Sequence, residues 1–283
     1  MDPRPARSME SSDCASFLQW ALPQIGLRWK GFRRVRGQVC KRIARRLTEL
    51  DLTDLSAYRR LLQPGAAEWQ ELSALCTVSI SRFYRDKDVF DCLGSTVLPA
   101  LAEQARSRGG DQIRCWSAGC ASGEESYTLA IQWGMLLAQR FPGVDLRVLG
   151  TDVDSTVLER ARAGCYKASS VEALPAAWRD QAFERREKLF CLREAWRRRA
   201  RFEHQDLLSA LPAGPFDLVL CRNVALTYFA EDQARIAIGR IAKRLRPGGA
   251  LVIGVHETLP AAMPEFEPWP GCRAVFRRSP PPH

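Results

Sequence analysis

Two adjacent carboxylates, Glu124 and Glu125, open a predicted helix that follows a buried strand and a glycine turn. The segment reads IRCWSAGCASGEESYTLAI, and its turn contains Gly119 and Gly123. Strand, glycine turn and helix are the layout of a nucleotide site, because backbone N–H groups at a helix N-terminus attract anions. Carboxylates at the same place repel a pyrophosphate, so the pattern argues against a dinucleotide.

The two glutamates favour a ligand that combines an adenosine ribose with positive charge. S-adenosylmethionine is such a ligand, since it carries an ammonium and a sulfonium. The alternative is that both glutamates only complement the helix dipole. The glycine turn considered by itself is a weak signal.

A carboxylate also ends the second predicted strand, in the segment GTDVD. An acidic side chain at this place takes both hydroxyls of a ribose, and we assign that role to Asp152. The alternative role is to cap the helix that starts near Thr156, which fits Asp154 better. The two aspartates therefore divide the two roles between them.

Further polar residues follow the later strands. They are Asp206, then Arg222 with Asn223, then His256 with Glu257. No nucleophile and base pair stands out among them. The three histidines, at 204, 256 and 283, do not have metal-ligand spacing, so no metal site is expected.

These residues need a sheet to bring them together. Apolar strand-like runs alternate with helical stretches from Gln112 onward, which indicates an α/β fold with a mostly parallel sheet covered on both faces. The predicted strands are residues 113–119, 145–154, 200–207, 216–223 and 250–257, with a possible added edge strand at 272–279.

The first eighty or so residues are predicted to form a small helical domain. Apolar residues recur every three or four positions from Val35 to Leu50, which predicts a helix with one buried stripe. A further short helix is expected to begin with Thr53 as its N-cap. Between residues 28 and 48 there are nine basic residues and no acidic one: Arg28, Lys30, Arg33, Arg34, Arg36, Lys41, Arg42, Arg45 and Arg46.

This basic segment suits an acidic partner, which could be nucleic acid, anionic lipid or an acidic protein. The alternative is a merely solvated helix face. Few aromatic residues accompany the basic ones, beyond Trp29 and Phe32, which argues against RNA because base stacking uses such residues.

The composition is that of a globular protein, with 283 residues, 46% hydrophobic residues, 26% charged residues and a formal net charge of +10. No apolar run is long enough for a membrane span, and the start lacks the apolar core of a signal peptide, so a cytoplasmic location is expected. Ten cysteines without a C-x-x-C pair are predicted to be reduced, mostly buried thiols.

Taken together, several motifs resemble the CheR-type protein-glutamate O-methyltransferases, which methylate chemotaxis receptors. The motifs are SRFYRDKDVF, WSAGCASGEESYTLA, GTDVD, VLERARAGCY, GPFDLVLCRN and LRPGGALVIG, in the family's order. The resemblance implies a class I methyltransferase sheet of seven strands, with S-adenosylmethionine as methyl donor. It also implies a helical domain at 1–82, a methyltransferase domain at 83–283 and a shortened insertion at about 166–200.

The resemblance also carries site residues onto this chain. Arg85 and Tyr228 take the catalytic positions, with Tyr228 near the transferring methyl group. The implied cofactor-binding residues are Ser79, Ser81, Arg85, Gly119, Glu124, Asp152, Asp206, Leu207, Asn223 and Val224.

The chain departs from the family's pattern in three places. VALT between Asn223 and Tyr228 is one residue longer than usual, and a motif that often reads GHSE is GVHE here, with Glu257 kept. The insertion FERREKLFCLREAWRRRARF lacks the glycine-rich turn of members that bind a receptor tail.

The implied reaction needs no general base, because a glutamate side chain is already ionised at neutral pH. The expected acceptor is an acidic protein surface, such as the cytoplasmic domain of a chemoreceptor, which binds through the basic N-terminal helix. Two alternatives remain: a methyltransferase acting on RNA or a small molecule, and a non-catalytic regulatory protein that binds S-adenosylmethionine.

Overall fold

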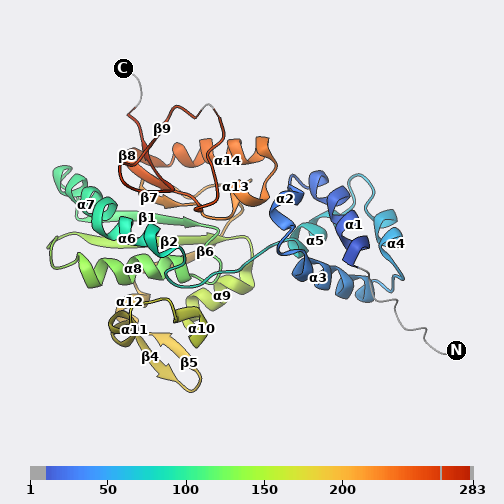
Figure 1. Cartoon of the computed structure of the whole chain (residues 1–283), viewed down its shortest axis with the longest axis horizontal. Helices are drawn as coiled ribbons and strands as arrows, with labels where there is room; N and C mark the ends of the chain where they lie inside the picture. The colour runs from blue at the N-terminus through green and yellow to red at the C-terminus, as the bar shows by residue number, and fades with distance from the viewer. Residues whose placement is uncertain (1–10, 262, 281–283) are drawn as a thin grey trace. The chain divides into compact units, whose positions relative to one another are not determined.

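The computed structural model describes residues 11–261 and 263–280 of the chain (Figure 1). These residues form two compact units. One consists of the described residues up to Val78 with Thr227–Ala230, and the other of Ser79–Leu226 with the described residues from Glu231 onward. The sequence placed the division after residue 82, and in the structure the first unit's main segment ends at Val78. The expectation that the chain starts without a signal peptide concerns residues 1–10 in part, and these lie outside the described residues.

The first unit is helical. Its core is built from apolar side chains on the helices, together with the ring of Tyr58. The helices are α1 (Ser11–Gln24), α2 (Trp29–Phe32), α3 (Arg36–Glu49), α4 (Leu55–Leu61) and α5 (Glu68–Leu75).

The helix α3 is the basic helix that the sequence predicted. It buries Val39, Ile43 and Leu47, which lie on one face because they are four residues apart. Two of its arginines are used inside the unit. Arg46 donates to both carboxylate oxygens of Glu68, at 2.9 and 2.8 Å, and Arg42 donates to backbone carbonyls.

The predicted N-cap of α4 was wrong by one residue. Asp54, not Thr53, precedes the helix, and its Oδ1 accepts a hydrogen bond from the Ala57 N–H at 2.8 Å. The Thr53 hydroxyl donates instead to the Asp54 carboxylate. The cap falls on Asp54 because its carboxylate reaches the N–H three residues ahead.

The second unit contains a seven-stranded sheet in the order β6-β2-β1-β7-β8-β10-β9. The first five strands of this order are parallel and the last two are antiparallel, so the predicted α/β class with a mostly parallel sheet is confirmed. The bounds are β1 (Gln112–Ala118), β2 (Asp145–Asp152), β6 (Ala200–His204), β7 (Phe216–Leu220), β8 (Leu245–Val252), β9 (Phe266–Pro268) and β10 (Val275–Arg278).

Helices cover both faces of this sheet, with α8 on one face and α14 on the other (Figure 1). The side of α8 holds the larger core, which includes the fully buried Trp133 and Leu129. The helices of this unit are α6 (Lys87–Cys92), α7 (Leu98–Ser107), α8 (Glu124–Leu136), α9 (Ser155–Ala163), α13 (Ala225–Tyr228, which runs into the helical unit) and α14 (Glu231–Ala242), with a π-helical turn at Leu93–Val97.

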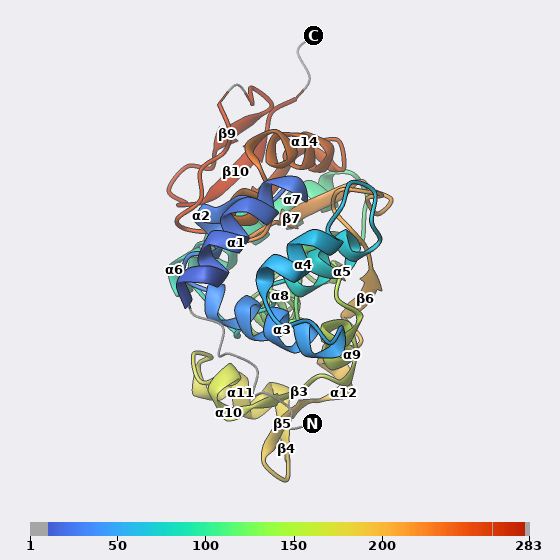
Figure 2. The ribbon, with the colours of Figure 1, turned by 90° about the vertical axis from the view of Figure 1, so that its right-hand side faces the viewer.

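A small second sheet lies in the insertion between α9 and β6, at the bottom of Figure 2. Its strands β3 (Cys165–Lys167), β5 (Leu189–Leu192) and β4 (Phe183–Arg186) pair in antiparallel fashion. Short helices flank them: α10 (Ala168–Val171), α11 (Ala176–Ala182) and α12 (Glu194–Arg197). The hairpin turn between β4 and β5 is made by Glu187, at φ 53°, and Lys188.

The expected edge strand near the end of the chain is not at the edge. β10 pairs with β8 on one side and with β9 on the other. The three-residue strand β9 therefore forms the edge, and its sequence, FEP, has too short an apolar run to be recognised.

The prediction of reduced cysteines was wrong for six of the ten. The structure pairs Cys14 with Cys40, Cys92 with Cys272, and Cys165 with Cys191 as disulfides. The fold makes these pairs: Cys165 and Cys191, for example, face each other in the β3–β5 ladder. Four cysteines are free and buried: Cys76, Cys115, Cys120 and Cys221.

Candidate active site

The candidate site lies in the second unit, at the carboxyl ends of β1, β2 and β7. The chain moves from β1 to β2 on one side and later returns to β7 on the other side of β1. Such a point, where the strand order reverses, is where open α/β sheets bind ligands.

The glycine turn after β1 lies against the residues that follow β7. Gly119 has a φ of +74°, which favours glycine, and a Cβ at this position would come within 2.4 Å of Val224. Its N–H donates to the Thr151 carbonyl at 2.8 Å. The turn therefore brings residues after β1, β2 and β7 to one place.

Asp152, at the end of β2, is 8% exposed and supports the glycine turn. Its Oδ2 accepts from the Ala121 N–H at 2.9 Å, and its Oδ1 accepts from the Asp154 N–H at 3.0 Å. Burial raises the pKa of Asp152, and these two hydrogen bonds oppose the rise. Each oxygen keeps a further lone pair for a hydroxyl donor.

The neighbouring Asp154 caps α9, as the sequence predicted. Its Oδ1 accepts from the N–H groups of Thr156 and Val157 at 2.9 and 3.4 Å. The two aspartates therefore make different contacts, although they are two residues apart.

Glu124, the first residue of α8, is 6% exposed. Its Oε1 is 3.4 Å from the Ser170 hydroxyl, and its Oε2 is buried without a hydrogen-bond partner. Burial raises the pKa of Glu124, while hydrogen bonds from its own N–H, from Ser81 and from Ser170 lower it. A buried carboxylate oxygen without a partner is costly, and a cationic ligand would remove this cost.

Glu125 is paired within the protein. Its Oε1 accepts from the Ser117 hydroxyl at 2.9 Å, and its Oε2 lies 2.7 Å from an Arg222 nitrogen. The same guanidinium pairs with Asp86 at 2.7 Å and donates to the Arg85 carbonyl at 2.9 Å. Arg222 thus connects the segment before α6 with the start of α8.

The segment 79–86, which precedes α6, contacts helix α8. The Tyr84 N–H donates to the Thr128 hydroxyl of α8 at 3.1 Å. The Arg85 guanidinium donates to the Ile80 carbonyl at 3.2 Å and is partly exposed. The Ser79 hydroxyl is buried without a partner, and Ser81 interacts with Glu124.

The remaining predicted cofactor-binding residues follow the carboxyl ends of β6 and β7. Asp206 follows β6, and its Oδ1 accepts from the Leu208 N–H at 2.8 Å, with Leu207 buried between them. Asn223 follows β7 with a φ of 56°, and its N–H donates to Glu257 Oε2 at 3.0 Å.

Tyr228 belongs to the helical unit. Its ring lies 5.1 Å from that of Phe32 in an edge-to-face arrangement. Its backbone carbonyl accepts from the Arg28 N–H at 2.8 Å. Of the predicted site residues, the structure thus places all but Tyr228 in the methyltransferase unit.

Comparison with known proteins decides the family. A family model described as CheR methyltransferase, SAM binding domain, matches residues 79–274. The chain belongs to the CheR methyltransferase family. It is therefore an S-adenosylmethionine-dependent methyltransferase.

Relatives in the family cover most of the chain. A chemotaxis protein methyltransferase of Listeria monocytogenes is 32% identical over 222 residues, which is 78% of this chain and 81% of the relative. The Klebsiella aerogenes protein of the same name is 34% identical, with 82% of this chain and 78% of the relative covered. The one from Escherichia coli K12 is 33% identical, with 78% and 76% covered.

The described part of the chain contains neither a membrane-spanning helix nor a metal-binding cluster of side chains. Within residues 11–261 and 263–280 no helix is long and apolar enough to cross a membrane. Over the same part of the chain, no three His, Cys, Asp or Glu side chains are grouped so that they could hold a metal ion. The expected cytoplasmic location stays a prediction.

Sequence reasoning did not assign the ion-pair network of this CheR domain. Arg222 was noted only as a residue after a strand, and Asp86 and Ser117 were not noted. The residue types gave no signal for this pairing, because Glu125 lies in the helix that follows β1, Arg222 follows β7, and only the fold brings these two strands together. Glu257 was predicted to follow a strand but was given no role, and in the structure its Oε2 accepts the N–H groups of both Asn223 and Gly254.

Proposed function

We propose that this chain transfers the methyl group of S-adenosylmethionine to a glutamate side chain of a chemotaxis receptor. The family and the chemotaxis methyltransferase relatives support the methyl donor and the pathway. Within the structure, the observation that carries the proposal is the buried, unpartnered Oε2 of Glu124 at the strand ends.

The residues fit this cofactor. In the proposal, Glu124 binds the ammonium group, since a carboxylate with a free buried oxygen is the complement of a cation. Asp152 binds the ribose hydroxyls through the lone pairs that its backbone contacts leave. Gly119 allows close approach of the ligand to the backbone, next to Val224.

Other predicted residues surround this core of the proposed site. Asp206, Leu207 and Asn223 would contact the adenine side, and the unpartnered Ser79 hydroxyl and Ser81 would offer polar contacts on the other side. These assignments rest on the resemblance, and the burial of Ser79 without a partner supports one of them.

The bound cofactor would supply an electrophilic methyl group on its sulfonium. The acceptor carboxylate is ionised at neutral pH, so the protein has to align it and not to deprotonate it. Arg85 is the proposed group that holds this carboxylate, because its side chain is partly exposed and its backbone is fixed by Arg222. Tyr228 would orient the acceptor, a role that rests on the resemblance.

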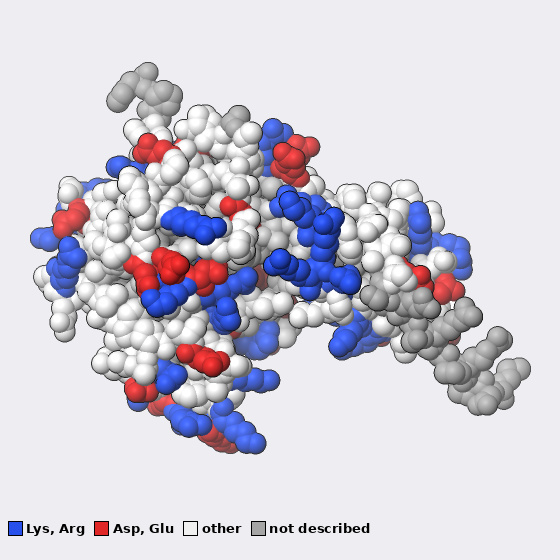
Figure 3. All heavy atoms as spheres, viewed as in Figure 1, with Lys and Arg blue, Asp and Glu red and all other residues white. Residues whose placement is uncertain are grey.

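The charge of the helical unit supports an acidic protein as acceptor. Basic residues are prominent on this unit (Figure 3). Six of them, on and next to helices α2 and α3, have exposed side chains: Lys30, Arg33, Arg34, Arg36, Lys41 and Arg45. Such a surface attracts a glutamate-rich partner. Docking on a receptor's tail peptide is not part of the proposal, because the β4–β5 turn contains no glycine.

The test is methyl transfer to a purified chemoreceptor cytoplasmic domain. We expect label from S-adenosylmethionine to appear in this domain and to disappear when its acceptor glutamates are replaced by alanine. Label in total cellular RNA that is added to the same reaction, with none in the receptor domain, would replace the proposal by the nucleic-acid alternative. Cofactor binding without any transfer would support the non-catalytic alternative.

A further inference from the structure

One face of the seven-stranded sheet carries a row of arginines across three neighbouring strands. Arg114 of β1 is in register with Arg147 of β2. Arg199 lies next to Arg147, because its carbonyl accepts from the Val148 N–H at 2.9 Å at the start of β6. Neighbouring strands are about 4.8 Å apart, so these like charges stand side by side, which is unfavourable unless an anion balances them.

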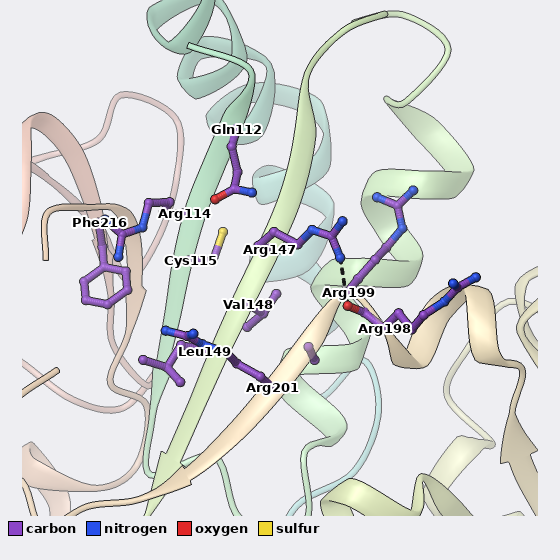
Figure 4. A pocket seen from close by; sticks show the side chains of 11 residues that line it. Gln112, Arg114, Cys115, Arg147, Val148, Leu149, Arg198, Arg199, Arg201 and Phe216 are labelled. Atoms are coloured by element: carbon purple, nitrogen blue, oxygen red, sulfur yellow. Dashed lines mark hydrogen bonds between the residues drawn. The ribbon is translucent and has the colours of Figure 1, made fainter. Parts of the chain in front are cut away.

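A second, mostly apolar row follows two residues further along the strands. Leu149 of β2 is in register with Trp116 of β1 and Arg201 of β6. The side chain of Arg201 extends from β6 across β2 toward Leu149, and Arg114 lies beside Phe216 (Figure 4). The rows lie on the face away from α8, because the alternate residues, such as Val148, belong to the core on the α8 side.

This part of the sheet is not covered by a helix of the connection that leads from β6 to β7. All of residues 205–215 are described, and none of them is helical. The result is a recess of about 400 Å³ over β1, β2 and β6. That volume lies within the range of roughly 300 to 1,000 Å³ that is usual for small-molecule sites.

The lining of the recess is positively charged. Five of its eleven lining residues are arginines and none is acidic. Carboxylates outside the lining balance part of this charge: Asp145 pairs with both Arg147 and Arg199, and Glu194 lies 3.7 Å from Arg198. Arg201 has only a long contact to Glu203, at 3.6 Å, and its side chain is 70% exposed.

We propose that this recess binds a nucleoside diphosphate through its phosphates, which contact the arginines. Guanidinium groups bind phosphate oxygens in pairs, and several converging arginines suit a group that carries more than one negative charge. Leu149 and Phe216 are buried beneath the arginine side chains, so the arginines supply the contacts of the recess. This site is separate from the proposed methyl-donor site, because it lies on the face of the sheet and not at the strand ends.

The size of the recess favours a nucleotide over an acidic protein segment. A stable protein interface buries about 800 Å² on each partner, and this requires a broad surface. A concave recess that is ringed by arginines on three strands matches a compact polyanion better.

The experiment is calorimetric titration of the full chain with ADP and GDP at about 0.15 M salt. Saturating S-adenosylhomocysteine is present throughout, so that neither probe can occupy the methyl-donor site. We expect both probes to bind, and the Arg147→Gln/Arg201→Gln variant to lose at least tenfold in affinity. Arg147→Lys/Arg201→Lys keeps the charge but not the paired hydrogen bonds, so it should lie in between.

The matched control is Arg106→Gln/Arg235→Gln, which removes the same charge from α7 and α14 outside the recess. It should change the affinity less than twofold. Unchanged binding of S-adenosylhomocysteine checks that each variant is folded, and if the double variant is not, Arg201→Gln alone should still lose severalfold. Absence of binding at millimolar probe, an equal loss in the control, or tighter binding of hexaglutamate than of ADP would each overturn the proposal.

Discussion

Glu124 and Glu125 are adjacent in the sequence but have opposite surroundings. Glu125 is paired with Arg222 at 2.7 Å, whereas one oxygen of Glu124 is buried without a partner. The pair therefore contributes one neutralised carboxylate and one carboxylate that is available to a cation. This difference explains why two acidic residues can stand at the start of a helix where a nucleotide phosphate would otherwise bind: one is neutralised by Arg222 and the other is available to a cationic ligand.

Replacing Glu124 by Gln should weaken the binding of S-adenosylmethionine but increase the stability of the cofactor-free protein at pH 7. Loss of a charged hydrogen-bond partner, worth roughly 1.5 to 3 kcal/mol, should weaken S-adenosylmethionine binding about tenfold to a hundredfold. The pKa of Glu124 is raised in the folded protein, so its stabilising contribution is present below pH 4.5 and is lost as the pH rises through the folded pKa. The cofactor-free variant should therefore be more stable than the wild type at pH 7.

Urea unfolding of the cofactor-free protein at pH 4 and pH 7 measures this effect. The stability gain of Glu124→Gln should shrink toward pH 4. Glu125→Gln is the matched control and should lower stability at pH 7, because it removes an ion-pair partner of the buried Arg222. A loss of stability in both variants would show that Glu124 is satisfied in the folded protein.

Asp152 and Asp154 provide a second comparison of neighbouring residues. Asp152→Asn should weaken S-adenosylmethionine binding by about tenfold or more, because it removes a charged acceptor for the ribose hydroxyls. Asp154→Ala should leave affinity unchanged and cost about 1 kcal/mol of unfolding free energy, because it removes the cap of α9. Calorimetry and urea unfolding measure the two effects, and an Asp152→Asn variant that is folded with full affinity would remove the ribose role.

At the scale of elements, the sequence was sufficient to predict the strands that are followed by polar turns and flanked by helices. β1, β2 and β7 carry apolar runs, so their positions and the polar residues that follow them could be predicted. β9 could not, because a three-residue strand has no period, and its pairing depends on β10. The disulfides could not be predicted either, since the cysteines of each pair are 26 to 180 residues apart.

The network around Arg222 was also beyond sequence reasoning, because its partners come from three separate segments. Asp86 precedes α6, Glu125 is the second residue of α8, and Arg222 follows β7. The residue types could be read, but not which of the many carboxylates would meet this guanidinium. The cap of α9 by Asp154 could be predicted, because its contacts are local.

Arg222→Met should destabilise the methyltransferase unit by about 3 to 5 kcal/mol. The side chain is 3% exposed, and its loss leaves the carboxylates of Glu125 and Asp86 without their main partner. In urea unfolding, the double variant Arg222→Met/Glu125→Gln should recover part of this loss, since one uncompensated charge is removed. Strictly additive losses would show that the pair does not interact.

At the scale of the whole molecule, the charges of the helical unit should act on the acceptor and not on the chemistry. Arg33→Gln/Arg34→Gln should raise the apparent KM for an acidic receptor domain severalfold with little change in kcat, because exposed charges steer association. The KM of the wild type should also rise with salt more steeply than that of the variant. Arg106→Gln/Arg235→Gln is the control, and an equal rise in KM there would assign the effect to net charge alone.

The central claim is that the methyl group is transferred to a carboxylate of a protein. The most direct test is the chemical stability of the labelled product. A glutamate methyl ester should release its label as volatile methanol in mild alkali, and ribonuclease should leave the label in place. Label that survives alkali, or that ribonuclease removes, would contradict the account.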